Sequence, residues 1–331
     1  MTYLLVFAGS GVVVVLAGTA LARYADVIAE RTGLGRLWVG SVLLAAATSL
    51  PELTTDVSAV RLGTADLAVG DLFGSSLANM LVLALIDLAW PRRRVLQQAA
   101  YAHALAATLA IGINALAAAL VLTRSDFAVL RVSPGSLVLF LLYLAGTRSV
   151  YRHLRQERMP PGSAEVAASA ARGMTLRRAM LRFGAAAALV FAAAPAFAWS
   201  AKGIAEASGL GNTFVGTWLL GLSTSLPELV ASLAAVRMGA FDLAVGNLFG
   251  SNALNMAIFL PLDLAQPGSL FSAVDPDHAL SGLFAVVLMS LGLAAIVYRA
   301  ERRFRMIEPS SLVILITYVT AIGILYVHGR G

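Results

Sequence analysis

The sequence has no cysteine among its 331 residues, which excludes disulfide bonds, thiolate nucleophiles and cysteine-bound zinc or iron–sulfur sites. Charge is scarce as well. Asp, Glu, Lys and Arg make up 13% of the chain, whereas soluble domains average about 25%. This is too little charge to solvate the surface of a globular protein of this size. With 59% hydrophobic residues and a mean hydropathy of +0.82, the composition predicts a membrane protein.

The few charges are mostly basic. Lys and Arg number 24 against 18 Asp and Glu, which gives a net charge of +6. In a membrane chain this excess indicates basic cytoplasmic loops rather than a nucleic-acid partner. The histidines lack the spacing of metal ligands, and we interpret all four as incidental: His103, His153, His278 and His328.

Apolar runs bounded by charges predict ten membrane-spanning helices, because one span needs about 20 apolar residues. The first run lacks the basic start of a signal peptide, so we expect it to be a span. The predicted spans cover residues 3–22, 37–60, 66–90, 97–122, 127–147, 180–201, 213–236, 242–264, 279–298 and 309–327. The expected fold is an all-α polytopic protein whose environment is the lipid bilayer of a prokaryotic plasma membrane.

The chain contains an internal repeat. Shifted by 176 positions, residues 20–89 align without a gap with residues 196–265, and 37 of the 70 aligned positions are identical. The best-matched stretches are TSLPEL, DLAVG and LFGS. Each half therefore supplies one copy of the same element.

The repeat predicts two halves of opposite orientation. Residues 1–147 and 180–331 each hold five predicted spans, an odd number, so the second copy enters the membrane upside down. Residues 148–179 form a basic linker between them. Placing this linker in the cytoplasm puts 19 of the 24 basic residues on the cytoplasmic side and both termini outside.

Two glutamates, Glu52 and Glu228, fall near the middle of apolar runs and occupy equivalent positions in the repeat. A carboxylate at membrane depth is costly unless it meets a cavity, a cation or a partner, so a functional role is expected. Thr48 and Ser49 lie four and three residues before Glu52, on its helical face. Thr224 and Ser225 stand in the same relation to Glu228.

Proline interrupts both of these helices. Pro51 and Pro227 each remove one backbone hydrogen bond, which leaves the carbonyls of Ala47 and Ser223 free as cation ligands. The following span in each half adds neutral oxygens and pairs of glycines whose GxxxG spacing lets helices approach closely. These residues are Ser75, Asn79, Ser251 and Asn255, with the pairs Gly70 and Gly74, and Gly246 and Gly250.

The charge of this constellation limits its chemistry. Two glutamates balance one divalent cation, two protons or two monovalent cations. Hydroxyl and carboxylate oxygens are the ligands of hard cations. Competition of Ca²⁺ with the other cations for one site would be sufficient for exchange.

At these residues the chain resembles the cation/calcium exchanger superfamily, which contains sodium/calcium and proton/calcium antiporters. GSVLLAAATSLPEL through GDLFGSSLANM, and GTWLLGLSTSLPEL through GNLFGSNALNM, resemble its two alpha repeats, here about residues 40–89 and 216–265. The resemblance implies a secondary antiporter rather than an enzyme, with alternating access through sliding of the first and sixth spans. It implies no cofactor and no obligatory protein partner.

The resemblance also implies roles for residues. Glu52 and Glu228 would be the central ion-binding acids, surrounded by the hydroxyl and amide residues named above. Backbone carbonyls near Ala45 and Gly221 would add ligands. Sodium/calcium members usually carry Asp where this chain has Asn255, and proton/calcium members often lack it, so the counter-ion, Na⁺ or H⁺, stays open.

Two further acids are accessory candidates. Asp71 lies four residues before Ser75 and eight before Asn79, on the same face and about 12 Å along the helix from Asn79. It is either a third acid at the outer mouth of the site or a solvated residue of the first turns. Asp56, one turn after Glu52, has the same ambiguity.

Three functions therefore compete. The first is exchange of Ca²⁺ for Na⁺ or H⁺, with Mn²⁺ or Mg²⁺ as other possible divalent substrates. The second is a passive cation channel, which a two-fold site buried at the midplane favours less. The third is an intramembrane enzyme, for which the sequence offers no catalytic Cys, Ser/His pair or His metal site.

Overall fold

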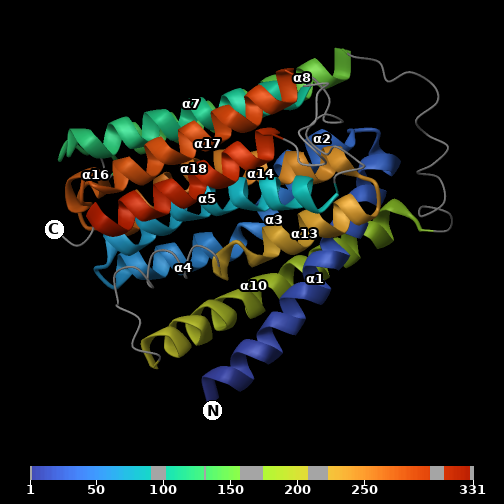
Figure 1. The fold of residues 1–331 in the computed structure, drawn as a ribbon, viewed down its shortest axis with the longest axis horizontal. Helices are drawn as coiled ribbons and strands as arrows, with labels where there is room; N and C mark the ends of the chain where they lie inside the picture. The colour runs from blue at the N-terminus through green and yellow to red at the C-terminus, as the bar shows by residue number, and fades with distance from the viewer. Residues whose placement is uncertain are drawn as a thin grey trace.

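The computed structural model describes residues 2–90, 102–129, 132–156, 174–207, 223–298 and 309–328. Within these residues the regular elements are helices, beside one isolated bridge between Val129 and Val132. Figure 1 shows long helices running roughly along one direction. The expected all-α architecture is confirmed.

The helices of the two halves follow each other in matching order. The first half comprises α1 (Thr2–Thr32), α2 (Arg36–Trp38), the π-helical segment η1 (Val39–Leu44), α3 (Ala45–Thr48), α4 (Leu50–Arg61), α5 (Ala65–Ala89), α7 (Ala102–Thr123) and α8 (Pro134–Gln156). The second comprises α10 (Leu176–Ala207), α13 (Leu226–Arg237), α14 (Phe241–Ala257), α15 (Phe259–Ala265), α16 (Leu270–Ala273), α17 (His278–Tyr298) and α18 (Pro309–His328).

Seven described helices are long and apolar enough to cross a membrane, or eight if the bent pair Arg36–Thr48 and Leu50–Arg61 is one span. Three predicted spans were misplaced at their ends. The span predicted at 3–22 continues as helix to Thr32, the one predicted at 127–147 is the helix Pro134–Gln156, and the one predicted at 180–201 is the helix Leu176–Ala207. Residues 213–222 of the span predicted at 213–236 lie outside the described residues. A count of ten spans stays a prediction.

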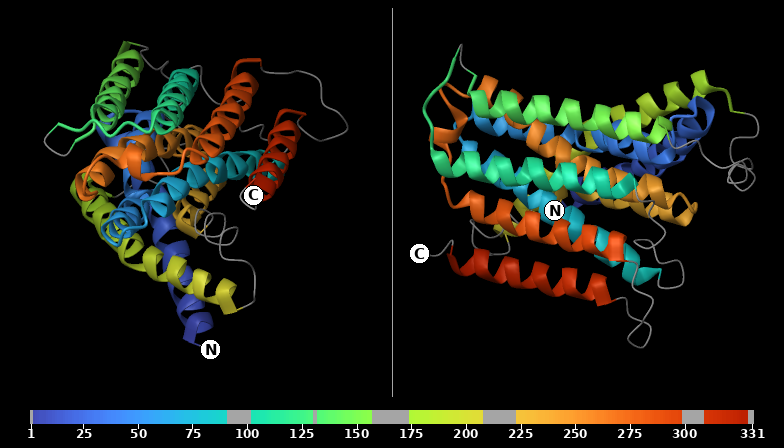
Figure 2. Two further views of the ribbon diagram at one scale, coloured as in Figure 1. Left: turned by 90° about the vertical axis from the view of Figure 1, so that its left-hand side faces the viewer. Right: turned by 90° about the horizontal axis from the view of Figure 1, so that it is seen from above.

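The third span of each half forms the centre of the bundle. In the most apolar stretch of α5, 72% of residues are buried, and along α14 and α15 the share is 89%, against 22% for α1, α10 and α18. Helices α5 and α14 pack against each other, and α7 and α17 flank them. Helices α1 and α10 lie side by side along one flank of the molecule (Figures 1 and 2). The centre is therefore where a site shielded from lipid can form.

The two halves hold each other through a reciprocal pair of buried aspartates. Asp263, at the end of the eighth predicted span, accepts hydrogen bonds from the backbone and hydroxyl of Ser133, the hydroxyl of Ser136 and the backbone N–H of Leu270. Its repeat equivalent Asp87 accepts one from Ser311, 2.6 Å away at the start of α18. Each carboxylate thus binds the first turn of the fifth span of the other half.

Two histidines form a second reciprocal contact, so our interpretation of all four as incidental was wrong. His103 Nε2, at the start of α7, lies 2.8 Å from Asp242 Oδ1, and His278 Nε2, at the start of α17, lies 3.3 Å from Asp66 Oδ1. The two aspartates are repeat equivalents in the DLAVG motifs. Sequence reasoning missed these pairs because the partners come from opposite halves.

We expect Asp263→Asn to lower thermal stability. The amide can accept hydrogen bonds at one oxygen only, so buried donors of the Asp263 cluster lose their acceptor, at about 1–3 kcal/mol for each. The measurement is the fraction of monodisperse protein after heating in detergent. Asp126→Asn, in an exposed loop, is the matched control. Equal melting of both variants would contradict this role for Asp263.

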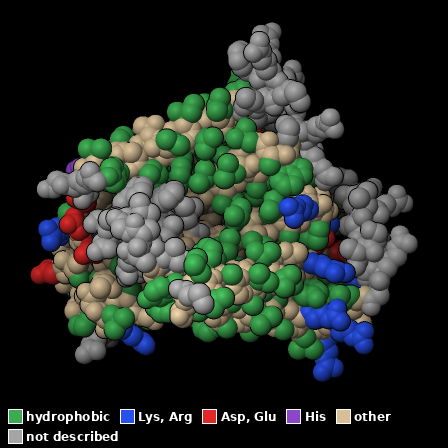
Figure 3. All heavy atoms as spheres, turned by 60° about the horizontal axis from the view of Figure 1, so that its bottom comes forward, with side chains coloured by type: hydrophobic (Ala, Val, Ile, Leu, Met, Phe, Trp, Pro, Cys, Tyr) green, Lys and Arg blue, Asp and Glu red, His purple; other side chains and the backbone are tan. Residues whose placement is uncertain are grey.

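The outer surface is apolar between two charged ends. Leu, Val, Phe and Ile side chains on the outward faces of α1, α8, α10, α17 and α18 are exposed. Figure 3 shows a hydrophobic face with Lys and Arg concentrated toward one end and Asp and Glu toward the other. This pattern suits a lipid-facing belt with unequal charge on its two sides.

Candidate ion-binding site

Both SLPEL motifs lie at helix breaks in the centre of the molecule. The axis bends by 43° between Arg36–Thr48 and Leu50–Arg61, and the break falls at Ser49. In the second half Ser225 has the same conformation before α13. Each break therefore lies two residues before a proline. Pro51 and Pro227 lie in the first turn of the next helix, where the missing N–H costs nothing.

Glu228 lies fully buried at this junction, with ligand-type groups from both halves around it. Its Oε1 accepts a hydrogen bond from Ser49 Oγ at 3.0 Å, across the repeat, and one from Ser251 Oγ at 3.4 Å. Its Oε2 is buried without a hydrogen-bond partner. One oxygen of this carboxylate is thus available to a ligand.

Glu52 is 1% exposed, and its Oε2 also has no hydrogen-bond partner. Glu228, Asp71 and Asp56 lie close enough to Glu52 for their charges to act on it. Buried like charges repel strongly at the low dielectric of a protein interior. The arrangement therefore favours a bound positive charge near Glu52.

Threonines connect the two halves in a pseudo-symmetric way. Thr48 Oγ1 lies 3.4 Å from Asn247 Oδ1, and Thr224 Oγ1 donates to Asp71 Oδ1 at 3.1 Å. Asn247 and Asp71 are repeat equivalents. Thr224 also lies 3.3 Å from Ser75 Oγ. The hydrogen bonds of the site form three groups, each of which joins the two halves. Ser49 and Ser251 contact Glu228, Ser75 and Asp71 contact Thr224, and Thr48 contacts Asn247.

The amide residues supply further buried acceptors. Asn79 Nδ2 donates to Asn252 Oδ1 at 2.8 Å, which leaves Asn79 Oδ1 without a partner. Neither amide atom of Asn255 has a partner, nor does Ser225 Oγ. Buried polar atoms without partners are rare in folded proteins, and a group of them requires an explanation such as a bound ion.

Of the four backbone carbonyl groups expected as ligands, three belong to residues that the structure describes. The carbonyl oxygen of Ala45 accepts the N–H of Ser49 at 2.9 Å and lies 3.3 Å from Thr48 Oγ1. Pro51 has no N–H to offer the carbonyl of Ala47, and the same holds for Pro227 and Ser223. Gly221 lies outside the described residues.

Asp71 is completely buried and in contact with Thr224, which excludes the second of the two alternatives, a solvated residue in the first turns. Asp56 is 1% exposed. Both acids therefore lie in the buried interior of the protein, beside the candidate site. The distance of 12 Å along the helix did not reveal this, because Thr224 approaches Asp71 from the other half.

The sequence analysis missed three asparagines. Asn247 contacts Thr48 and donates to Ser232 Oγ at 3.1 Å. Asn252 donates to the carbonyl of Ser76, and Asn114 donates to the carbonyl of Asn252 at 3.1 Å. Asn247 and Asn252 differ from their repeat equivalents, Asp71 and Ser76, and that difference was the signal available in the sequence.

The geometry limits what can bind. Among the described residues, no three acidic or histidine side chains gather into a metal-binding group. A divalent cation between Glu52 and Glu228 would therefore need neutral hydroxyl, amide and carbonyl oxygens to complete its shell. The two broken helices provide these groups.

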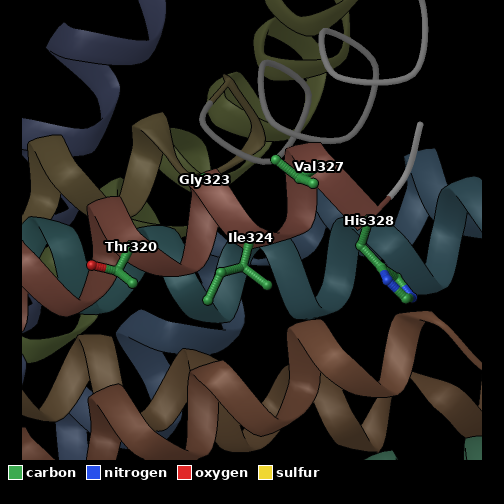
Figure 4. A pocket seen from close by; sticks show the side chains of 5 residues that line it. All are labelled: Thr320, Gly323, Ile324, Val327 and His328. Carbon is green, nitrogen blue, oxygen red and sulfur yellow. The ribbon is translucent and has the colours of Figure 1, made fainter. Parts of the chain in front are cut away.

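A surface hollow of about 410 Å³ lies elsewhere, lined by Thr320, Gly323, Ile324, Val327 and His328 (Figure 4). All five residues belong to α18, and none is acidic. The hollow lies on the outer side of the bundle and is separate from the candidate site.

The sequence is similar to a family of known proteins over most of its length. Residues 2–149 and 178–327 match the family model described as sodium/calcium exchanger protein. The chain is 28% identical over 297 residues to the inner membrane protein YrbG of Escherichia coli (strain K12), covering 86% of each. It is 28% identical over 274 residues to the putative antiporter CaxA of Alkalimonas amylolytica, covering 81% of this chain and 83% of that one.

A solved structure shows the same fold. The sodium-calcium exchanger NCX_Mj, soaked with 10 mM Na⁺ and zero Ca²⁺, superposes with a TM-score of 0.72 at 20% identity. The match covers 97% of this chain and 98% of that one.

Proposed function

The chain belongs to the sodium/calcium exchanger protein family, and from this premise we propose that it exchanges Ca²⁺ for Na⁺ across the membrane by alternating access. The ions compete for one site between Glu52 and Glu228. The observation that carries the proposal is the set of buried oxygens without hydrogen-bond partners on both broken helices. Hard cations take carboxylate, hydroxyl, amide and carbonyl oxygens as ligands.

Charge balance determines how many ions the proposed site can hold. Glu52 and Glu228 supply two negative charges, and Asn79 and Asn255 are neutral. One Ca²⁺ or two monovalent cations therefore neutralise the central pair. A proton counter-ion, or Mn²⁺ or Mg²⁺ in place of Ca²⁺, remains compatible with the same ligands.

The proposed moving elements are α1 and α10. They pack on each other through Phe7 and Phe197, whose ring centroids lie 4.5 Å apart, and through Tyr3 and Trp199 at 4.9 Å. Both helices are mostly exposed, whereas α5 and α14 are mostly buried. A pair that packs on a rigid centre and faces lipid can shift at lower cost than the centre itself.

The proposed orientation places both termini outside the cell and the basic linker, residues 148–179, in the cytoplasm. The concentration of Lys and Arg side chains toward one end of the molecule supports it (Figure 3). The sequence similarity to a bacterial inner membrane protein supports a plasma-membrane location.

Uptake of ⁴⁵Ca²⁺ into proteoliposomes tests the proposal. We expect an outward Na⁺ gradient to drive uptake and a pH gradient of equal size to drive little. The reverse result would identify H⁺ as the counter-ion. If neither gradient drives uptake, exchange is excluded, and ion currents through single proteins in planar bilayers would then identify a channel.

A further inference from the structure

A pair of buried acids, Asp56 on α4 and Asp71 on α5, adjoins the central site. Each is at most 1% exposed, and their carboxyl groups lie close enough to interact. Neither oxygen of Asp56 has a hydrogen-bond donor, and Oδ2 of Asp71 has none. Within the described residues, the ion pairs involve other acids. Two buried carboxylates without a counter-charge are strongly unfavourable.

In the second half, the positions equivalent to this acid pair carry neutral residues. The repeat equivalents are Ser232 and Asn247, and Asn247 Nδ2 donates to Ser232 Oγ at 3.1 Å. No side-chain polar atom of that neutral pair is buried without a hydrogen-bond partner. Two carboxylates offer acceptors alone, so the pair in the first half needs a positive charge from elsewhere.

A neutral ligand stands beside the acid pair. Thr224, from the second half, donates its hydroxyl hydrogen to Asp71 Oδ1 at 3.1 Å and lies 3.3 Å from Ser75 Oγ. A hydroxyl group can donate its hydrogen to one acceptor while its oxygen acts as a ligand of a cation. Through Thr224 and Ser75 the acid pair is connected to the central site.

We propose that Asp56, Asp71 and Thr224 form a second cation site, which holds one alkali-metal ion beside the site between Glu52 and Glu228. The inference rests on the proposed function, since it assumes that cations reach the centre of the bundle. Ca²⁺ fits less well, because it takes about 6–8 oxygens and this position offers two carboxylates and a hydroxyl. A second divalent ion would also repel the Ca²⁺ at the central site.

Equilibrium binding of ²²Na⁺ to the purified full-length protein, with Ca²⁺ present at saturating concentration, tests this site. Ca²⁺ fills the central site, so any sodium that stays bound reports the acid pair. We expect the wild type to retain a single Ca²⁺-resistant sodium ion per chain. Absence of such sodium overturns the proposal and identifies the pair as two carboxyl groups that share a proton.

Two substitutions copy the neutral residues of the second half: Asp71→Asn and Asp56→Ser. Each is expected to abolish Ca²⁺-resistant sodium binding, while saturable ⁴⁵Ca²⁺ binding shows that the variant is folded. Asp126→Asn, in an exposed loop, removes an acid elsewhere and is expected to keep both ions bound. Sodium binding that survives both substitutions would overturn the proposal.

Failure of this inference is distinguishable from failure of the proposed function. If the wild type binds and transports Ca²⁺ but holds no Ca²⁺-resistant sodium, the central site stands and the second site is refuted. If the wild type binds no Ca²⁺, the proposed function fails, and any sodium bound at Asp56 and Asp71 then belongs to a different activity.

Discussion

Glu52→Gln and Glu228→Gln are each expected to abolish Ca²⁺ exchange. Either change removes one of the two charges that balance a divalent cation in a buried site. At about 4 Å and an effective dielectric constant of about 20, one unit-charge interaction is worth about 4 kcal/mol, or about three orders of magnitude in affinity. Gln keeps the size of the side chain, so the loss would come from charge and not from packing.

Ca²⁺ uptake into proteoliposomes and equilibrium ⁴⁵Ca²⁺ binding measure this loss. Glu30→Gln provides the matched control, because Glu30 is exposed on α1 and the same atoms change. Normal flux in Glu52→Gln would remove Glu52 from the site. In Glu228→Gln the hydroxyl of Ser49 can still donate to the amide oxygen, so we expect that variant to remain folded.

The second large effect is expected at Gly250 on α14, where Gly250→Ala should prevent stable folding. A Cβ there would lie 2.3 Å from the carbonyl oxygen of Ser41 and 2.5 Å from its Cα, both backbone atoms of η1. A side chain could rotate away, but a backbone cannot. Relief therefore requires α14 to separate from η1, at a cost above the roughly 1–3 kcal/mol of ordinary overpacking.

Gly112→Ala on α7 is the control for this prediction, since nothing lies within 4 Å of its added Cβ. That variant should gain up to about 1 kcal/mol from helix propensity. The measurement is the yield and thermal midpoint of monodisperse protein in detergent. A Gly250→Ala protein as stable as the wild type would show that η1 and α14 are not held at this distance.

Much of this organisation could be predicted because the sequence contains the repeat twice. The matching SLPEL and LFGS stretches predict the broken helices and the spans that follow them. The close approach expected of Gly246 and Gly250 is confirmed, as both face the backbone of the helix before the first break. The glycine spacing in the sequence and the close helix packing in the structure have the same cause, a backbone contact that leaves no room for a side chain.

Other features could not be predicted from the sequence, because they depend on contacts between residues far apart in the chain. Hydropathy ends the first span at residue 22, where charges begin, yet the helix continues to Thr32. In this extension Val27 and Ile28 are buried, and Asp26 pairs with Arg36. The length of an apolar run reflects the thickness of the bilayer, and a helix can extend beyond that run. The position of Asp71 was ambiguous for a related reason, since its burial depends on Thr224, 153 residues away.

The reciprocal aspartate contacts make each half of the chain depend on the other. Asp263 binds the start of α8 and Asp87 the start of α18, so each half stabilises the other with the same residue. A half made as a separate chain would leave its aspartate and its fifth span without partners. Two such chains could satisfy each other only when inserted in opposite directions. The contacts are therefore those that two half-length chains would make in an antiparallel dimer.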